Sequence, residues 1–164
     1  MEEDDDDFDN QDDLNEKIEL SVSRFEEMIR NQDRYFFVVD ALIKIIDFYI
    51  ENGEHSKALE VSGYAFSLHP NSVNFLIKQA HLFAITGQEK RALDTLEKVE
   101  RISPYDLELH IIRGNILNTS GQFSAALDCF KKALPLSDVK DEIYFSMAIT
   151  YQNMLNYPKA IEYF

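Results

Sequence analysis

The side chains able to do chemistry in this sequence are few and widely spaced. None of its four histidines, His55, His69, His81 and His110, stands three or four residues from another, the spacing that places two metal ligands on one helix face. The single cysteine, Cys129, has no partner for a metal site, and there is no glycine-rich phosphate loop or nucleophile motif. We therefore expect a chain that is not an enzyme, with no catalytic residue, no metal site and no cofactor.

The charge of the chain excludes several classes of partner. The 164 residues carry 30 Asp and Glu against 16 Lys and Arg, a net charge of −14, and nine of the acids lie in residues 1–13. A chain this acidic is a poor ligand for nucleic acid or for an anionic membrane surface. One cysteine cannot form an internal disulfide, and no apolar run is long enough to span a membrane, so we expect a cytoplasmic protein.

Glycine and alanine recur with a period of 34 residues. Glycine does so at Gly53, Gly87 and Gly121, and alanine at Ala58, Ala92, Ala126 and Ala160. Because glycine closes helices and proline cannot continue them, these breakers divide the chain into alternating helical segments. The predicted helices are about 34–51, 54–67, 71–85, 88–101, 105–119, 122–134, 139–153 and 156–164. A fixed period of this length predicts a solenoid.

The columns of each period resemble the tetratricopeptide repeat (TPR). The first period shows a large residue at Leu42, an aromatic at Tyr49 and a small residue at Ala58, and small residues recur in the first helix of later periods, as at Gly114. Small side chains allow close packing where two helices cross. The resemblance covers 39–164. It implies an all-α fold, a right-handed α-solenoid of antiparallel helix pairs, with an N-terminal capping helix.

The predicted organisation follows from this register. Residues 1–13 contain one aromatic and no aliphatic residue after Met1, too little apolar surface to fold. From Leu14 onward, apolar residues recur at spacings of four and three, which predicts an amphipathic helix. The segments are 1–13, a disordered acidic tail; 14–38, the capping helix and entry to the first repeat; 39–72, repeat 1; 73–106, repeat 2; 107–140, repeat 3; and 141–164, a truncated repeat 4.

The inner face of the first helix in each repeat is the predicted partner-binding groove. The resemblance implies a concave groove for an extended or helical peptide, and the stripes along it mix polar with apolar side chains. The candidate residues are Lys44, Asp47, Ile77, Lys78, His81, Ile111, Asn115 and Asn118. The fourth repeat continues the stripe with Glu142, Ser146, Ile149 and Asn153, and an apolar row of Ile43, Ile77, Ile111 and Phe145 flanks it. Some related chaperone adaptors clamp a terminal carboxylate with Lys and Asn. Here Ile43 and Asp47 stand at those positions, so we expect no such clamp.

The sequence thus predicts a non-catalytic protein-interaction module, a scaffold or adaptor that binds a partner's peptide or helix in the groove. Two alternatives stay open at this stage. The chain is a structural module that assembles through its solenoid ends, with a homodimer through the open C-terminal end, or it is the regulatory part of a larger enzyme. Neither nucleic acid nor a membrane is an expected partner.

Overall fold

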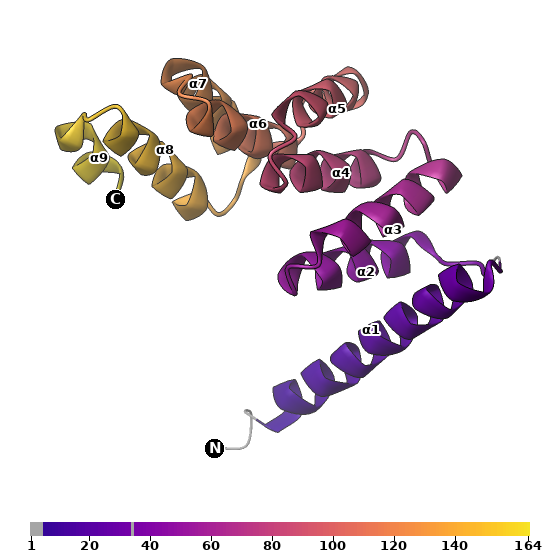
Figure 1. The fold of residues 1–164 in the computed structure, drawn as a ribbon. Helices are drawn as coiled ribbons and strands as arrows, with labels where there is room; N and C mark the ends of the chain where they lie inside the picture. Colours follow the sequence, from indigo (N-terminus) through magenta and orange to yellow (C-terminus); the bar gives the residue numbers. More distant parts are fainter. Residues whose placement is uncertain (1–4, 34) are drawn as a thin grey trace. The chain divides into compact units, whose positions relative to one another are not determined.

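A computed structural model describes the backbone of residues 5–33 and 35–164, and the side chains from residue 16 onward except at 34. These residues form α-helices and one short 3-10 turn, and no strand (Figure 1). The chain divides into two compact units, Met1–Pro70 and Asn71–Phe164. The first contains α1 (Asp5–Asn31), α2 (Val39–Glu51) and α3 (His55–Leu68). The second contains α4 (Val73–Ile85), α5 (Glu89–Ile102), α6 (Leu107–Thr119), α7 (Phe123–Ala133), η1 (Leu134–Leu136), α8 (Asp141–Asn153) and α9 (Tyr157–Tyr163).

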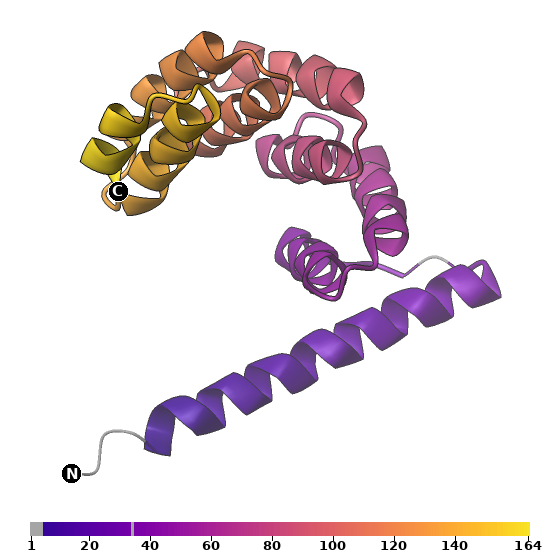
Figure 2. The same ribbon diagram turned by 60° about the vertical axis from the view of Figure 1, so that its left-hand side comes forward.

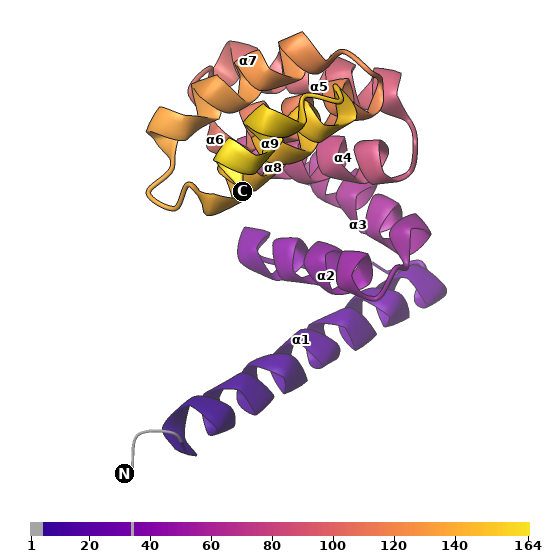
Figure 3. The same cartoon turned by 90° about the vertical axis from the view of Figure 1, so that its left-hand side faces the viewer.

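In the N-terminal unit, α1 packs beside the pair formed by α2 and α3 (Figure 3). Its apolar stripe is buried at Val22, Phe25 and Met28. The ring of Phe25 meets those of Phe37 and Tyr64 edge to face, with centroids 5.7 and 5.6 Å apart. This aromatic cluster holds α1 against α2 and α3. Helix α1 therefore covers the first helix pair, which is the role predicted for the capping helix.

A polar network adds to this contact. The Tyr49 hydroxyl of α2 and the Lys57 ammonium of α3 each donate to Glu26 Oε1 of α1 at 3.0 Å. Lys57 also pairs with Glu54 at 2.8 Å. The hydrogen bond from Lys57, followed by that from Tyr49, lowers the pKa of Glu26, whereas burial and the bond to Glu26 raise the pKa of Tyr49 to about 12. All three helices of the unit therefore meet at one carboxylate.

Helix α1 differs from the sequence expectation at its start. It begins at Asp5, inside the segment 1–13 that was predicted to be a disordered tail, and not at Leu14. Carboxylates near a helix N-terminus interact favourably with the helix dipole, which gives an acidic segment a reason to extend the helix. Residues 1–4 of the predicted tail lie outside the described residues. The division of the chain into tail, cap and four repeats remains a prediction.

In the C-terminal unit, three helix pairs follow one another: α4 with α5, α6 with α7, and α8 with α9 (Figure 2). Helix α6 also packs on both helices of the pair before it, and α8 on both α6 and α7. The first helices α4, α6 and α8 thus form one layer and the second helices another. The helix bounds of this unit agree with the predicted ones to within about two residues, the usual uncertainty at helix ends. In the N-terminal unit, α2 begins at Val39, about five residues after the predicted start at 34.

The turn inside each pair has a left-handed residue after its first helix. Gly53, Gly87 and Gly121 occupy it with φ of +71°, +73° and +76°. The fourth turn places Leu155 there, with φ of +59°. The next residue donates back to the preceding helix in every case, as Asn156 N does to Tyr151 O at 2.9 Å. The geometry of the fourth turn is therefore the same, although its residue has a Cβ.

The predicted alanine column is buried in all four repeats. Ala58, Ala92 and Ala126 are fully buried and Ala160 is 3% exposed. Helices α6 and α7 approach closely at Gly114, where an added Cβ would lie 2.5 Å from Cε1 of Phe130. Proline also acts as predicted at Pro135: α7 ends at Ala133, two residues before it, and η1 continues the chain.

None of the helices in the described part of the chain is both long and apolar enough to cross a lipid bilayer.

Candidate partner-binding site

Helices α6 and α8 position the candidate site in the C-terminal unit. Between and behind them lies a core that includes Phe130, Ile143 and Met147, all at most 1% exposed. Farther along the same two helices, Asn153 Nδ2 donates to Asn118 Oδ1 at 3.2 Å. The core and this cross-helix bond fix how the outward-facing side chains of α6 and α8 lie relative to one another.

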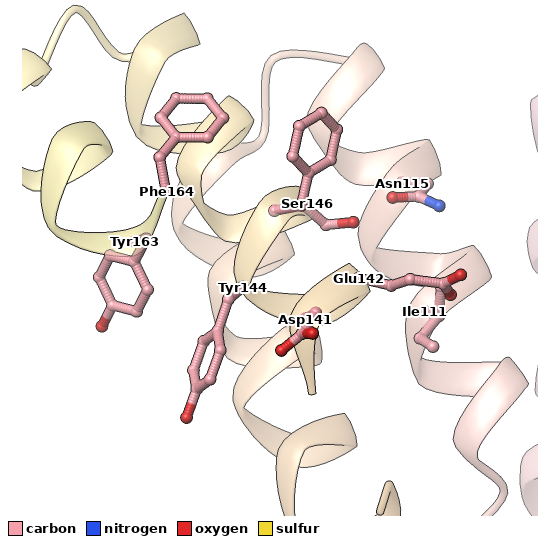
Figure 4. A pocket seen from close by; sticks show the side chains of 9 residues that line it. Ile111, Asn115, Asp141, Glu142, Tyr144, Ser146, Tyr163 and Phe164 are labelled. Carbon is pink, nitrogen blue, oxygen red and sulfur yellow. The ribbon is translucent and has the colours of Figure 1, made fainter. Parts of the chain in front are cut away.

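A pocket of about 680 Å³ opens where α6, α8 and the end of α9 meet (Figure 4). Helix α6 contributes Ile111 and Asn115, and Figure 4 shows Glu142 of α8 extending toward them. The lining residues are Ile111, Asn115, Asp141, Glu142, Tyr144, Phe145, Ser146, Tyr163 and Phe164. A volume of this size holds one or two side chains of a bound peptide.

Aromatic rings form much of the pocket. Phe145 and Phe164 meet edge to face with centroids 5.7 Å apart, and Tyr144 lies 6.0 Å from Tyr163. Tyr163 in turn stacks on Tyr151 at 5.3 Å, and burial raises the pKa of Tyr163. Phe145 is 58% exposed and Phe164 66%, so both rings keep open surface. Such rings supply large contact area with little loss of conformational freedom on binding.

Two carboxylates stand at the mouth of the pocket. Asp141 and Glu142 occupy the first turn of α8 and are exposed. The nine lining residues include no Lys or Arg, so the pocket combines aromatic walls with uncompensated negative charge.

The pocket unites two of the predicted groove residues, Ile111 and Asn115, which lie one helical turn apart on α6. Asn118 is half-buried and bonded to Asn153. On α4, Lys78 and His81 are half-buried, whereas Ile77 is only 3% exposed. Ile77 therefore departs from the expectation of an accessible apolar row, because its side chain belongs to the buried surface of α4.

The remaining candidates, Lys44 and Asp47, lie on α2 in the N-terminal unit. There Lys44 is exposed and lines a smaller pocket of about 190 Å³ between α1 and α2, together with Lys17 and Asp40. Asp47 is half-buried. The prediction of one groove shared by α2, α4 and α6 remains a prediction.

Sequence reasoning missed part of the pocket. Tyr163 and Phe164 line it from the end of α9. The repeat period predicts a helix there, paired with α8, but not that these two rings face the pocket. Asp141 and Tyr144 lie next to the predicted stripe of α8 but outside it. The residue pattern of α8 was the available signal, since Glu142 and Ser146 stood in the predicted fourth stripe and Phe145 in the apolar row beside it.

His110 and Arg113, two polar residues of α6, contact groups outside the pocket, and the buried His110 Nδ1 has no hydrogen-bond partner among the described residues. His110 is 4% exposed, its Nε2 lies 3.1 Å from the Pro104 carbonyl oxygen, and burial lowers its pKa. Arg113 donates to Glu100 of α5 at 2.9 Å. Cys129 is buried, and burial raises the pKa of its thiol. Among the described residues these groups stabilise the packing of α5, α6 and α7 and do not line the pocket.

Stacked antiparallel helix pairs, a 34-residue period and small residues at each crossing define a class, the helical repeat proteins with a TPR-like fold. No family model matches the sequence, and no curated protein matches it. Solved structures do match, and they confirm the predicted all-α repeat fold.

Three of these solved structures show how similar they are to this chain in sequence and in fold. TTC0263, a thermophilic TPR protein of Thermus thermophilus, is 21% identical with a TM-score of 0.72, over 93% of this chain and 82% of that one. MamA MSR-1 is 20% identical with a TM-score of 0.63, over 92% and 90%. A MamA fragment from Desulfovibrio magneticus RS-1 is 18% identical with a TM-score of 0.64, over 76% and 70%. At these identities the likeness concerns the fold.

Proposed function

We propose that this chain is a protein-interaction module that holds a segment of a partner protein along α6 and α8, seated in the pocket of Figure 4. The observation that carries the proposal is the pocket itself: it lies on the face of the first helices, combines apolar with polar lining, and includes the predicted Ile111 and Asn115. The TPR-like fold supports the proposal because such scaffolds commonly present peptide-binding surfaces.

The lining suits a peptide better than a rigid small molecule. Asn115 and Ser146 offer amide and hydroxyl groups that bond to a peptide backbone, whereas Phe145 and Ile111 offer apolar contact to its side chains. Because Phe145 is 58% exposed, covering it would bury apolar area that the chain alone leaves in water. The proposed role is that of a scaffold or adaptor without catalytic residues.

Paired affinity capture from the source cells tests this proposal. One bait is the full chain, and a second carries Phe145→Ala with Asn115→Ala. A control bait carries Tyr105→Ala, which removes a ring that is 81% exposed but does not line the pocket. We expect a partner held by the first and control baits and weakened on the order of 30-fold, the size of a hot-spot effect, on the second. Equal retention on all three baits would place binding elsewhere.

A second bait series addresses the wider groove predicted from the sequence. Changing Lys78 and His81 to Ala alters the half-buried polar residues of α4 and leaves the pocket lining intact. Loss of the same partner with this bait extends the binding surface to α4. Retention confines the surface to α6, α8 and α9.

Self-assembly is the second candidate, and the outer surface of α9 favours it. Leu155, Tyr157 and Ile161 are 71%, 56% and 75% exposed. Leu127 lies 34 residues before Ile161, at the equivalent position of α7. Its side chain is only 6% exposed, because it belongs to the core that contains Ile143 of α8. Light scattering across a concentration series tests this candidate. A dimer that Ile161→Glu returns to monomer supports it, and a monomer at every concentration contradicts it.

A further inference from the structure

We infer that the pocket of α6, α8 and α9 selects a cationic side chain, so that the bound segment is a basic peptide presenting Arg or Lys. This inference rests on the proposed function, because it names the chemistry of the partner at the same site. Three features of the described residues carry it: the charge of the lining, the open aromatic rings, and the cost of covering the pocket with an apolar group.

The first feature is the charge of the lining. Asp141 and Glu142 contribute two carboxylates, and none of the nine lining side chains is basic. Of the nearby cations, Lys131 is paired with Asp128 at 3.3 Å, and Lys140 directly precedes Asp141 in the chain. Residues 71–164 carry 11 Asp and Glu against 10 Lys and Arg, so the unit is nearly neutral, and the attraction for a cation comes from the two carboxylates of the lining.

The second feature is the aromatic wall. A cation over a ring face within about 6 Å is attracted by the ring quadrupole. The chain uses this contact repeatedly within its own fold. Arg91 lies 4.1 Å from the ring centroid of Phe83, and Lys159 lies 5.2 Å from that of Tyr151. In the pocket, Phe145 and Phe164 retain open surface and Tyr144 is 37% exposed, so ring surface remains for a cation from outside.

The third feature distinguishes a cationic occupant from an apolar one. A Leu or Phe side chain would cover the rings equally well. It would also remove water from Asp141 and Glu142 without offering them a hydrogen-bond donor, which is costly for an ionised group. An Arg side chain stacks its planar guanidinium on a ring and donates to a carboxylate with the same group, and a Lys does so as a point charge. The lining therefore favours a basic residue over an apolar one.

Fluorescence anisotropy with two matched probes tests the inference on the full chain. One probe is a short fluorescein-labelled peptide in which Arg alternates with Leu. In the other probe, Gln replaces every Arg. We expect the Arg probe to bind at least about tenfold more tightly, as close charge pairs do at interfaces, and its affinity to fall as salt is added.

Variants locate the effect in the pocket. Asp141→Asn with Glu142→Gln removes both carboxylates, and Phe145→Leu removes a ring while keeping apolar volume at an exposed position. Each should weaken the Arg probe about tenfold, and the change of the two carboxylates should leave the Gln probe unchanged. The matched control is Asp94→Asn with Glu97→Gln, which removes the same charge from two exposed residues of α5 outside the pocket. This control should leave the Arg probe bound.

The outcomes separate this inference from the proposed function. Equal affinity for both probes, with both lost on Phe145→Ala, overturns cation selection and supports peptide binding in the pocket. An equal loss of the Arg probe in the pocket variant and in the α5 control also overturns it, because the attraction is then that of the chain's overall charge. No binding of the Arg probe overturns it as well, and the capture experiment then decides the proposed function by itself.

Discussion

At the scale of single residues, Gly114 is the position where the fold is least tolerant. A Cβ there would lie 2.5 Å from Phe130, whose ring is fully buried and would have to shift within the core. We expect Gly114→Ala to lower the free energy of unfolding by about 1–3 kcal/mol, the cost of overpacking a core, despite the better helix propensity of Ala. Urea unfolding followed by circular dichroism measures this change.

The matched control for Gly114 is Gly63→Ala in α3. No atom lies within 4 Å of a Cβ built on Gly63, and its backbone is helical. This substitution should stabilise the chain by up to about 1 kcal/mol, because Ala favours the helix and Gly does not. A Gly114→Ala variant as stable as Gly63→Ala would mean that α6 and α7 do not approach as closely as the structure shows.

Leu155 is the residue at which one repeat departs from the other three. It has φ of +59° where the equivalent positions have glycine, and its side chain is 71% exposed. A left-handed conformation costs a residue with a Cβ roughly 1–2 kcal/mol, and the greater freedom of Gly in the unfolded chain offsets part of the gain. We expect Leu155→Gly to raise the free energy of unfolding by about 0.5–1 kcal/mol.

Thermal unfolding of Leu155→Gly beside Gly121→Leu checks that argument. The second substitution places a Cβ at the same left-handed position of the third repeat, where φ is +76°, and should destabilise the chain. Destabilisation by both substitutions would show instead that the Leu155 side chain packs on other residues.

At the scale of elements, the attachment of α1 depends on one aromatic contact more than on its ion pair. Lys57 and Glu26 are 49% and 40% exposed, so solvent screens their interaction. Phe25 is 3% exposed against Phe37 and Tyr64. We expect Phe25→Ala to cost about 3–5 kcal/mol of the packing that holds α1, so that α1 detaches before the rest unfolds.

Hydrogen exchange resolves this effect by element. The amides of α1 should lose protection in Phe25→Ala, whereas those of α6 and α7, in the C-terminal unit, should keep theirs. Leu20→Ala on the same helix is the control, because Leu20 is 62% exposed and its loss should change little. Equal loss of protection in all helices would show that the chain unfolds as one cooperative unit.

The sequence predicted the helices and the turns between them better than any other feature of the structure. Gly53, Gly87 and Gly121 marked the turns, and the alanine column marked the helix crossings, because each requires a residue type that few alternatives satisfy. The start of α1 was not predictable from apolar spacing, since an acidic segment extends a helix through backbone and dipole effects that leave no hydrophobic period. For the pocket, Ile111 and Asn115 were predicted as groove residues from their place on α6, but that Tyr163 and Phe164 also line it depends on tertiary packing.

At the scale of the whole molecule, two depressed pKa values make stability depend on pH on the acidic side of neutrality. Hydrogen bonds lower the pKa of Glu26, and burial lowers that of His110. In both cases the unfolded chain binds protons more readily than the folded one, so stability rises with pH between the folded and unfolded pKa. The contribution of His110 is present above its unfolded value of 6.5 and is lost as pH falls below it.

Substituting His110 isolates the contribution of this side chain to the pH dependence of stability. Leu42 and Leu76 fill the same column of the first two repeats and are at most 1% exposed, so the packing there suits leucine. His110→Leu should therefore fold, and it should gain stability relative to the native chain as pH falls from 7 toward 5. The free energy of unfolding from urea titrations at several pH values measures the difference. Because burial is the main cause of the shift, added salt should change it little. A difference that stays constant with pH would show that the His110 pKa is the same in the folded and unfolded chain.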